Sequence, residues 1–283
     1  IKLNIINNDN NKIIIKKNYL NIYNYKCSSK YENTYKSIKK AYENCKNKNF
    51  KGLVTLPIRK DLIKKNIDSK FIGHTEFLQK LDNKKYGNMI MYHNKIIIST
   101  ITTHIKISSV TSLIKNKNFL RNQILNLYQT LRNDFNIKRP KLVISGLNPH
   151  AGENGEIGKE EILYIKPVIN KLIKQNIDIR GPYSADSLLI KENSNSYDCF
   201  IFIFHDQALI PFKLISRFSG VNYTGNLSVI RLSPDHGTAY NLKGSKDIST
   251  ISLENCFSLI NMISRNRKKN DKSKKISKSK LYI

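Results

Sequence analysis

The feature that most constrains the fold is a short apolar run, residues 199–204, which ends directly in the polar trio His205-Asp206-Gln207. The run has the length and the aromatic and β-branched content of a buried strand. Ionisable side chains at the end of such a strand lie where open α/β sheets place their ligands, in the crevice beyond the carboxyl ends of the strands. We therefore expect a pocket at this point of the chain.

Strand-like and helix-like segments alternate along the rest of the chain. Alternation of this kind predicts an α/β fold with a largely parallel sheet. The expected strands are 52–56, 88–93, 97–103, 141–147, 199–204 and 228–232, and the expected helices are 33–46, 109–135, 159–175 and 249–264. Residues 265–280 are rich in Lys, Ser and Asn, which predicts a solvated, disordered tail.

The formal net charge of +28 would by itself suggest nucleic acid or an anionic membrane as a partner. The excess is mostly Lys, however, and it accompanies heavy use of Ile and Asn, as AT-rich codons would supply. The basic residues are also spread along the chain, so we favour compositional drift over selection for a polyanion. A basic, non-enzymatic binding protein stays open as an alternative.

Other bulk features narrow the class of protein. No apolar run reaches the ~18 residues that a membrane span needs, and no secretory leader is recognisable. The four cysteines form no C-x-x-C pair and match no zinc motif. We therefore expect reduced thiols and a cytoplasmic protein.

Histidine is scarce, with six residues in the whole chain, and most of them fall in clusters that follow strands. These are His104, His150, His205 and His236, with His74 in a further loop. Three neutral imidazoles can hold a divalent ion and leave positions open for a substrate. Each histidine could equally cap a strand end, and the long spacings leave both interpretations open.

Some polar side chains near these clusters suit a bound anion. They are Thr75, Lys213, Asn222 and Arg231. Because the chain has 49 Lys and Arg residues, any single one is a surface charge by default. Gly152, Gly155 and Gly158 open a helix and could accept a phosphate, although the spacing is not that of the dinucleotide fingerprint.

Seven motifs, taken together and in order, are far more specific than any one of them. They are Gly-His-Thr-Glu-Phe (73–77), Thr-Thr-His (102–104), Gly-Leu-Asn-Pro-His-Ala-Gly-Glu (146–153), Gly-Lys-Glu-Glu (158–161), Gly-Pro-x-x-Ala-Asp (181–186), His-Asp-Gln (205–207) and Asp-His-Gly-Thr-Ala (235–239). In these motifs the chain closely resembles the PdxA family, the 4-hydroxythreonine-4-phosphate dehydrogenases of pyridoxal phosphate biosynthesis. The resemblance runs from about residue 50 to about residue 264.

The resemblance implies a two-domain α/β/α subunit like those of isocitrate and isopropylmalate dehydrogenases. It implies a first domain of residues 1–67 plus 223–264 and a second domain of 68–222 with the metal and dimer site. A basic tail at 265–283 is an addition to the family pattern. It also implies a homodimer with a shared active site. No membrane partner is expected, because no apolar run is long enough to span a bilayer.

The implied reaction is oxidation of 4-phosphooxy-L-threonine by NAD, with NADP as the alternative cofactor, followed by loss of CO2 to give 3-amino-2-oxopropyl phosphate. A divalent metal, with zinc, magnesium and cobalt as candidates, would assist both steps. The alternatives are a paralogue acting on phospho-threonate or phospho-erythronate and the non-enzymatic basic protein.

The resemblance also implies roles for individual residues. The metal ligands would be His104, His150 and His205, with His205 supplied by the other subunit. The substrate would be bound by His74, Thr75, Lys213, Asn222 and Arg231. The cofactor would contact His236, Gly237, Thr238 and Ala239. Asp186 and Lys213 are the candidates for the general base.

The chain departs from the family pattern in places. The family begins with a strand and a Gly/Pro-rich loop that are absent here, so we expect the N-terminal βα unit to be missing. Leu56 and Arg59 stand where the family usually has Gly and His, and Asn226-Leu227-Ser228 replaces Gly-Leu-Pro. We expect these changes to affect cofactor affinity and stability more than metal binding.

Overall fold

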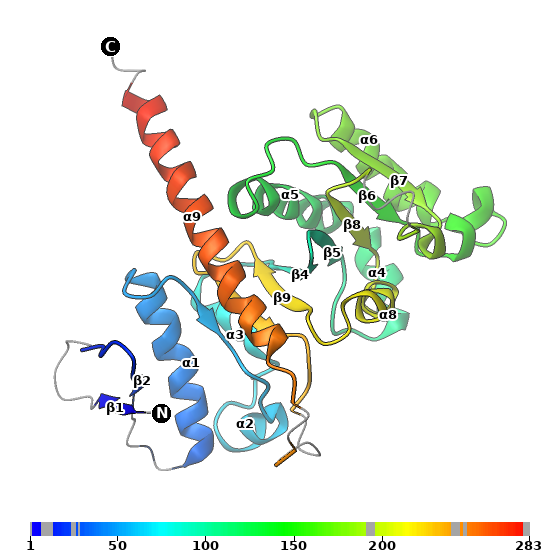
Figure 1. Ribbon diagram of the computed structural model, residues 1–283. Coiled ribbons are helices and arrows are strands. Elements are labelled where there is room, and N and C mark those ends of the chain that lie inside the picture. Colours follow the sequence, from blue (N-terminus) through cyan, green and yellow to red (C-terminus); the bar gives the residue numbers. More distant parts are fainter. Residues whose placement is uncertain are drawn as a thin grey trace.

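The core of the molecule is an eight-stranded sheet with the order β3-β10-β9-β4-β5-β8-β6-β7 (Figure 1). The computed structural model describes residues 2–6, 14–23, 27, 29–190, 196–238, 244–245 and 248–279, with side chains to residue 273. The strands are β3 (Leu53–Val54), β4 (Asn88–His93), β5 (Ile96–Thr100), β6 (Leu142–Ser145), β7 (Ile179–Tyr183), β8 (Cys199–Phe202), β9 (Val221–Gly225) and β10 (Arg231–Pro234). They come from both predicted domains, whose division stays a prediction.

The sheet is mixed, whereas the sequence predicted a largely parallel one. β5, β8, β6 and β7 are mutually parallel, and β3 is parallel to β10. β4 is antiparallel to both β5 and β9, and β9 is antiparallel to β10. The β4–β5 turn explains the reversal, because Asn94 and Lys95 both have positive φ, as in a two-residue hairpin. The β3 and β10 end of the sheet therefore runs opposite to the β5–β7 end.

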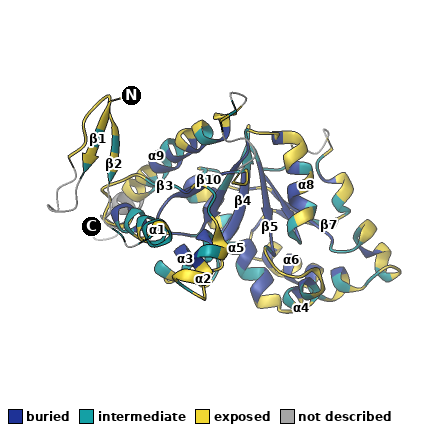
Figure 2. Ribbon diagram, turned by 90° about the horizontal axis from the view of Figure 1, so that it is seen from below, coloured by how far each residue is buried: buried dark blue, intermediate teal, exposed yellow. Residues whose placement is uncertain are grey.

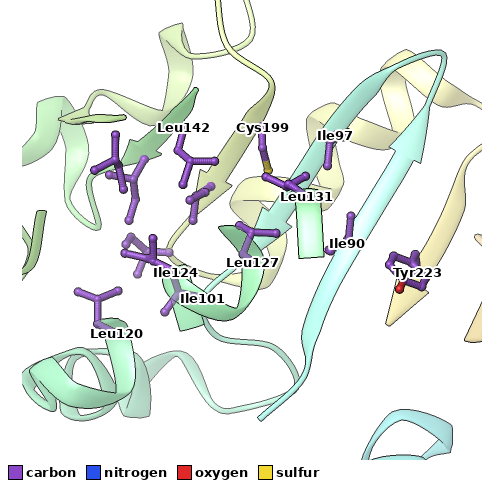
Figure 3. Close-up of a cluster of buried hydrophobic side chains, with 14 of the residues drawn as sticks. Ile90, Ile97, Ile101, Leu120, Ile124, Leu127, Leu131, Leu142, Cys199 and Tyr223 are labelled. Carbon is purple, nitrogen blue, oxygen red and sulfur yellow. The ribbon is translucent and has the colours of Figure 1, made fainter. Parts of the chain in front are cut away.

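Helices cover both faces of the sheet, which explains why the strand at 199–202 is apolar throughout. Cys199 and Ile201 belong to the cluster that packs on α4 (Val110–Lys115), α5 (Lys117–Asp134), α6 (Lys166–Ile173) and α9 (Ile251–Ser279). Phe200 and Phe202 face the opposite way, toward α8 (His205–Ser216). Figure 3 shows one face of α5, carrying Leu120, Ile124, Leu127 and Leu131, turned toward Leu142 and Cys199 of the strands.

A second group of helices packs beside β3. These are α1 (Lys30–Lys46), α2 (Lys60–Asn66) and α3 (His74–Leu81), whose apolar side chains form a separate cluster with Leu53. β1 (Leu3–Ile6) and β2 (Leu20–Tyr23) form a parallel pair of their own, and Figure 2 shows this pair standing beside the main body. None of the residues of β1 and β2 is fully buried.

Several predicted elements differ from the observed ones. The helix expected at 109–135 is divided at Asn116, whose side chain accepts a hydrogen bond from the Phe119 N–H at 3.0 Å and so begins α5. The helix expected at 159–175 starts with a π-helical turn, η3 (Glu161–Ile165). Helix α8 and strand β9 were not predicted; Pro211 lies inside α8 and obscures it in the sequence.

The prediction of a disordered tail from residue 265 is wrong for residues 265–279, because α9 continues to Ser279. Arg267 explains the continuation. Its guanidinium donates to both carboxylate oxygens of Asp134, at 2.6 and 3.1 Å, and to the Tyr223 hydroxyl at 3.0 Å. It also donates to the carbonyls of Leu227 and Ser228, in the turn between β9 and β10. The start of the supposed tail thus fastens α9 to α5 and to the sheet.

The described part of the chain contains neither a membrane-spanning helix nor a disulfide bond. No helix there combines the length and the apolar character needed to cross a membrane. The four cysteines are free thiols, and three of them are buried.

Replacing Arg267 by Gln should lower the free energy of unfolding by about 3–5 kcal/mol, because it leaves the Asp134 carboxylate buried without its charged partner. Lys268→Gln, at the exposed neighbouring position, should change it by no more than about 0.5 kcal/mol. Urea denaturation of the two variants is the measurement. Equal stability of both would contradict a docked segment beyond residue 264.

Candidate functional site

A cavity of about 340 Å³ lies over one face of the sheet, between the start of α3 and helix α8. Most of the predicted site residues line it: His74, Thr75, His104, His205, Lys213, Asn222, Arg231, His236, Gly237 and Thr238. Ala239 lies outside the described residues. His150 and Asp186 do not line the cavity.

The directions of the strands place this cavity over a sheet face rather than along one carboxyl edge. His104 and His205 follow the carboxyl ends of β5 and β8, but β10 runs the opposite way. Asn222 pairs with Ser233 and Met91, so these side chains share one face of the sheet. The predicted crevice beyond one set of strand ends is therefore only part of the site.

His104 and His205 lie together because the β5–β8 ladder continues past the strands. The Thr102 N–H and hydroxyl both donate to the Ile203 carbonyl, at 3.0 and 2.8 Å. The two imidazole rings consequently lie 5.6 Å apart between centroids, at 48° to each other. Gln207 strengthens the arrangement, because its amide donates to the Gly146 carbonyl at 3.1 Å while its oxygen accepts the Ile203 N–H.

Each of these two imidazoles has a carboxylate beside its Nδ1 atom. The Nδ1 of His205 lies 2.9 Å from Asp206, and the Nδ1 of His104 lies 3.6 Å from Glu76. The interaction with His104 lowers the pKa of Glu76. A carboxylate at one ring nitrogen fixes the tautomer and leaves the other nitrogen available to a ligand.

Arg231 is buried, and its nearest hydrogen-bond partners are hydroxyls rather than carboxylates. Its guanidinium donates to Thr55 at 2.7 and 3.1 Å, to Thr224 at 3.0 Å and to Thr75 at 3.3 Å. Burial lowers its pKa to about 10, so it remains charged near neutral pH. A buried cation without a bonded counter-ion is stabilised by an anion that enters beside it.

His74 is held neutral in the same cavity. Burial, together with the positive charges of Arg231 and Lys60, lowers its pKa to about 3. Its imidazole can therefore accept or donate a hydrogen bond near neutral pH without adding positive charge.

The cavity also contains polar residues to which no role was assigned from the sequence. Thr55 bonds Arg231, while Glu76 and Asp235 are the carboxylates of the lining. Lys213 lies 3.1 Å from Asp235. Glu76 and Asp235 belong to the motifs at 73–77 and 235–239, so motif membership was the available signal.

His150 and Asp186 lie near each other, apart from this cavity. They follow β6 and β7, and His150 contributes to lowering the pKa of Asp186, whose largest cause is the Ser184 hydroxyl bond. No group of three or more His, Cys, Asp or Glu side chains within the described ranges is close enough to hold a metal. One chain therefore supplies two of the three predicted metal ligands at one place.

The turn that carries His150 is left-handed over residues 150–154. Glu161, which is buried, stabilises it by accepting the Leu147 and Asn148 N–H groups at 2.8 Å each. A Cβ atom on Gly152 would lie 2.7 Å from the Glu161 carboxylate and 2.5 Å from the Gly158 carbonyl. The glycines of this loop thus allow close packing around a carboxylate, which disfavours the phosphate site considered from the sequence.

Comparison with known proteins relates this chain to one family. The profile of the family described as "Pyridoxal phosphate biosynthetic protein PdxA" matches residues 3–260. A 4-hydroxythreonine-4-phosphate dehydrogenase of Wigglesworthia glossinidia brevipalpis is 41% identical over 223 residues, which are 79% of this chain and 67% of that relative. The enzyme of that name from Aquifex aeolicus is 40% identical over 197 residues, 69% of this chain and 59% of the relative. The matches thus cover between 59% and 67% of the length of these two relatives.

Solved structures agree. A crystal structure of 4-hydroxythreonine-4-phosphate dehydrogenase from Klebsiella pneumoniae superposes with a TM-score of 0.80 at 25% identity, covering 93% of this chain and 83% of that one. The corresponding structure from Burkholderia phymatum gives a TM-score of 0.66 at 31% identity, covering 81% and 68%. The α/β fold expected from the sequence is confirmed.

The lowered pKa of His74 predicts a specific dependence of stability on pH. The unfolded chain binds a proton at this residue below about pH 6.5, and the folded chain does so only near pH 3. Stability therefore falls as the pH is lowered through this window. Between about pH 6.5 and pH 4 the wild type should lose about 2–3 kcal/mol more than His74→Gln. Denaturation at both pH values measures the difference, and parallel losses in both proteins would refute it.

Proposed function

The chain belongs to the PdxA family, and on that basis we propose that it oxidises 4-phosphooxy-L-threonine with NAD, in pyridoxal phosphate biosynthesis. The oxidised product then loses CO2 to give 3-amino-2-oxopropyl phosphate. A phosphorylated small molecule fits the size and the positive charge of the cavity.

The observation that carries the proposal is the burial of the Arg231 charge with hydroxyls, and no carboxylate, as its hydrogen-bond partners among the described residues. Its planar guanidinium suits bidentate binding of a phosphate or carboxylate. The hydroxyls of Thr55 and Thr75 hold it in place, and Lys213 and Asn222 line the same cavity. These residues would bind and orient the substrate anions, while neutral His74 supplies a hydrogen bond.

The donor set fits a divalent metal, with His104 and His205 as two of its ligands. Zinc, cobalt and magnesium are the candidates, and imidazole nitrogens favour the first two. When bound, such an ion lowers the pKa of an alcohol and polarises a carbonyl. Glu76 and Asp206 would orient the two imidazoles from behind.

The loop after β10 fits a nicotinamide cofactor. His236, Gly237 and Thr238 line the cavity, and a Cβ atom on Gly237 would meet nothing within 4 Å. The cofactor supplies the hydride acceptor. We propose NAD, with NADP as the alternative, in contact with this loop and with Ala239.

The third metal ligand we assign to a second copy of the chain. The resemblance implied that His205 crosses from the partner, yet in this chain His205 already faces His104. We therefore propose that His150, with Asp186 nearby, is contributed by the partner. The outer face of α8 and the turn after it could receive a second copy. The large apolar side chains of Ile210 and Leu214 on the helix and of Phe218 in the turn are 63%, 76% and 75% exposed.

The first test is turnover. Metal-loaded protein should form NADH from 4-phosphooxy-L-threonine, and a chelator should abolish the signal. Phospho-threonate and phospho-erythronate are the comparison substrates, and faster turnover of either would favour the paralogous function. No NADH from any of the three would overturn the proposal.

Arg231→Lys tests the anion site. The variant keeps a positive charge but loses the bonds of the guanidinium to the hydroxyls and to the anion, so substrate binding should weaken by about 10- to 100-fold. Calorimetric titration with inorganic phosphate and with substrate measures the loss. Lys51→Met changes a lysine that donates a hydrogen bond to Asn261, away from the cavity, and serves as the matched control.

Mixed dimers test which histidine crosses between subunits. Neither His150→Ala nor His205→Ala should be active alone, but their mixture should recover ~25% of wild-type activity, since half the dimers are mixed and each has one intact site. A mixture of His104→Ala and His205→Ala should recover nothing, because both residues belong to one chain's half-site. If His205 came from the partner instead, both mixtures would regain one intact site per mixed dimer, so recovery in the second mixture would restore that assignment.

A further inference from the structure

Asp235 is fixed in the wall of the cavity by contacts from three elements. Its backbone N–H lies 3.2 Å from the Ser252 hydroxyl of α9 and 3.3 Å from the Gly220 carbonyl before β9. Its carboxylate oxygen Oδ1 lies 3.1 Å from the Nζ atom of Lys213, on α8. The same Nζ atom donates to the Asp235 backbone carbonyl at 3.1 Å. Lys213 is thus held to Asp235 by two separate acceptors.

The second carboxylate oxygen of Asp235 has no hydrogen-bond partner among the described atoms, and it is buried. A buried, unpaired carboxylate oxygen is costly, and protonation relieves the cost. Burial accordingly raises the pKa of Asp235, against the opposing effect of Lys213. Glu76, the other carboxylate of the lining, has a lowered pKa because it interacts with His104. Two carboxylates with opposite shifts in one cavity suit different tasks, and the one with the raised pKa is the better proton acceptor.

We propose that Asp235 acts through Lys213 as the proton acceptor of the oxidation. Lys213 passes a proton to Asp235 and takes the proton of the substrate hydroxyl in its place. The O–H bond of the substrate breaks and an N–H bond forms on Lys213, while the proton that Lys213 gave up now resides on Asp235. The hydride would pass from carbon to a bound nicotinamide, so that the alcohol becomes a carbonyl and the Asp235 carboxylate becomes a carboxylic acid. The inference rests on the proposed function and deepens it.

The geometry explains why Asp235 suits this task better than the alternatives. Asp186 does not line the cavity, and Asp206 is 70% exposed and bound to His205. The side chain of Asp235 is only 11% exposed, whereas that of Lys213 is 50% exposed and can reach a ligand. Lys213 is therefore the catalytic residue, and Asp235 is the residue that positions it and holds the proton.

Asp235→Asn is the decisive variant. The amide keeps an acceptor for Lys213, and the backbone carbonyl holds Lys213 in any case, but the amide cannot take up a proton. The kcat value should fall by about 100-fold or more, while the Kd for inorganic phosphate and the KM stay within about threefold. Glu254→Gln, an exposed change on α9, is the matched control and should leave both constants unchanged.

The pH profile gives a readout that a merely structural role would not move. A proton acceptor must be ionised, so wild-type kcat should fall as the pH is lowered through the pKa of Asp235, and this acid limb should be absent from Asp235→Asn. Among the described residues, three charged or titratable groups face Asp235. They are Lys213 and His205 of α8 and His236 of the loop after β10. These groups are all retained in the variant and so do not account for a lost limb.

A measurement on the wild type covers the case in which the variant does not fold. Two protons move together in the proposed step, so kcat in mixtures of light and heavy water should follow a curved rather than a linear dependence on deuterium content. A linear dependence, a kcat of Asp235→Asn within about threefold of wild type, or a loss confined to KM would each overturn the role of Asp235. An inactive wild type would instead overturn the proposed function, and this inference with it.

Discussion

The burial of Arg231 without a bonded carboxylate is the constraint on which the rest of the site depends. A guanidinium in this position is tolerated because hydroxyls from three separate elements receive it: Thr55 after β3, Thr75 in α3 and Thr224 in β9. The same charge, together with burial, keeps His74 neutral. The cavity therefore has a buried positive charge at Arg231, beside which an anion can bind, and its two carboxylates lie next to His104 and Lys213. This arrangement of charged side chains suits the binding of a ligand better than it suits the stability of the fold without one.

The mixed topology of the sheet makes this arrangement possible. β4 and β9 are both antiparallel to a neighbour on each side, so they join two blocks of strands that run in opposite directions. One block delivers His104 and His205 from its carboxyl ends, and the other delivers the loop that begins at Asp235. Helix α8 spans the two, since His205 lies at its start and Lys213 lies two turns later beside Asp235. The hydrogen bonds that Arg267 donates to the Leu227 and Ser228 carbonyls hold the β9–β10 turn in place. They thereby position the strands that carry Asn222 and Arg231.

Local patterns in the sequence predicted much of this and failed where distant contacts decide. The apolar runs located β4, β5, β6 and β8, and the motifs that contain histidine located nine of the residues that line the cavity. Strand direction was missed because it depends on which strands pair, and β4 pairs with β9, more than a hundred residues away in sequence. The tail was misjudged for a similar reason: composition favours disorder after residue 264, but Arg267 meets Asp134 at a separation of 133 residues. The placement of His205 beside His104 likewise follows from the β5–β8 ladder and not from any spacing in the sequence.

The strained turn at residues 150–154 bears on how the site is completed. All five residues have positive φ, and a left-handed conformation costs roughly 1–2 kcal/mol for each residue other than glycine. Glu161 accepts hydrogen bonds from the backbone N–H groups of Leu147 and Asn148 and from the side-chain amide of Asn148, and these bonds offset part of this cost. The result is a rigid presentation of His150 away from the cavity of its own chain, next to Asp186. A fold that needed all three histidines within one subunit would gain nothing from holding one of them in a costly conformation outside the pocket. Strain of this kind is retained where a residue must be presented in one fixed direction, and the proposed site between two copies of the chain would supply that requirement.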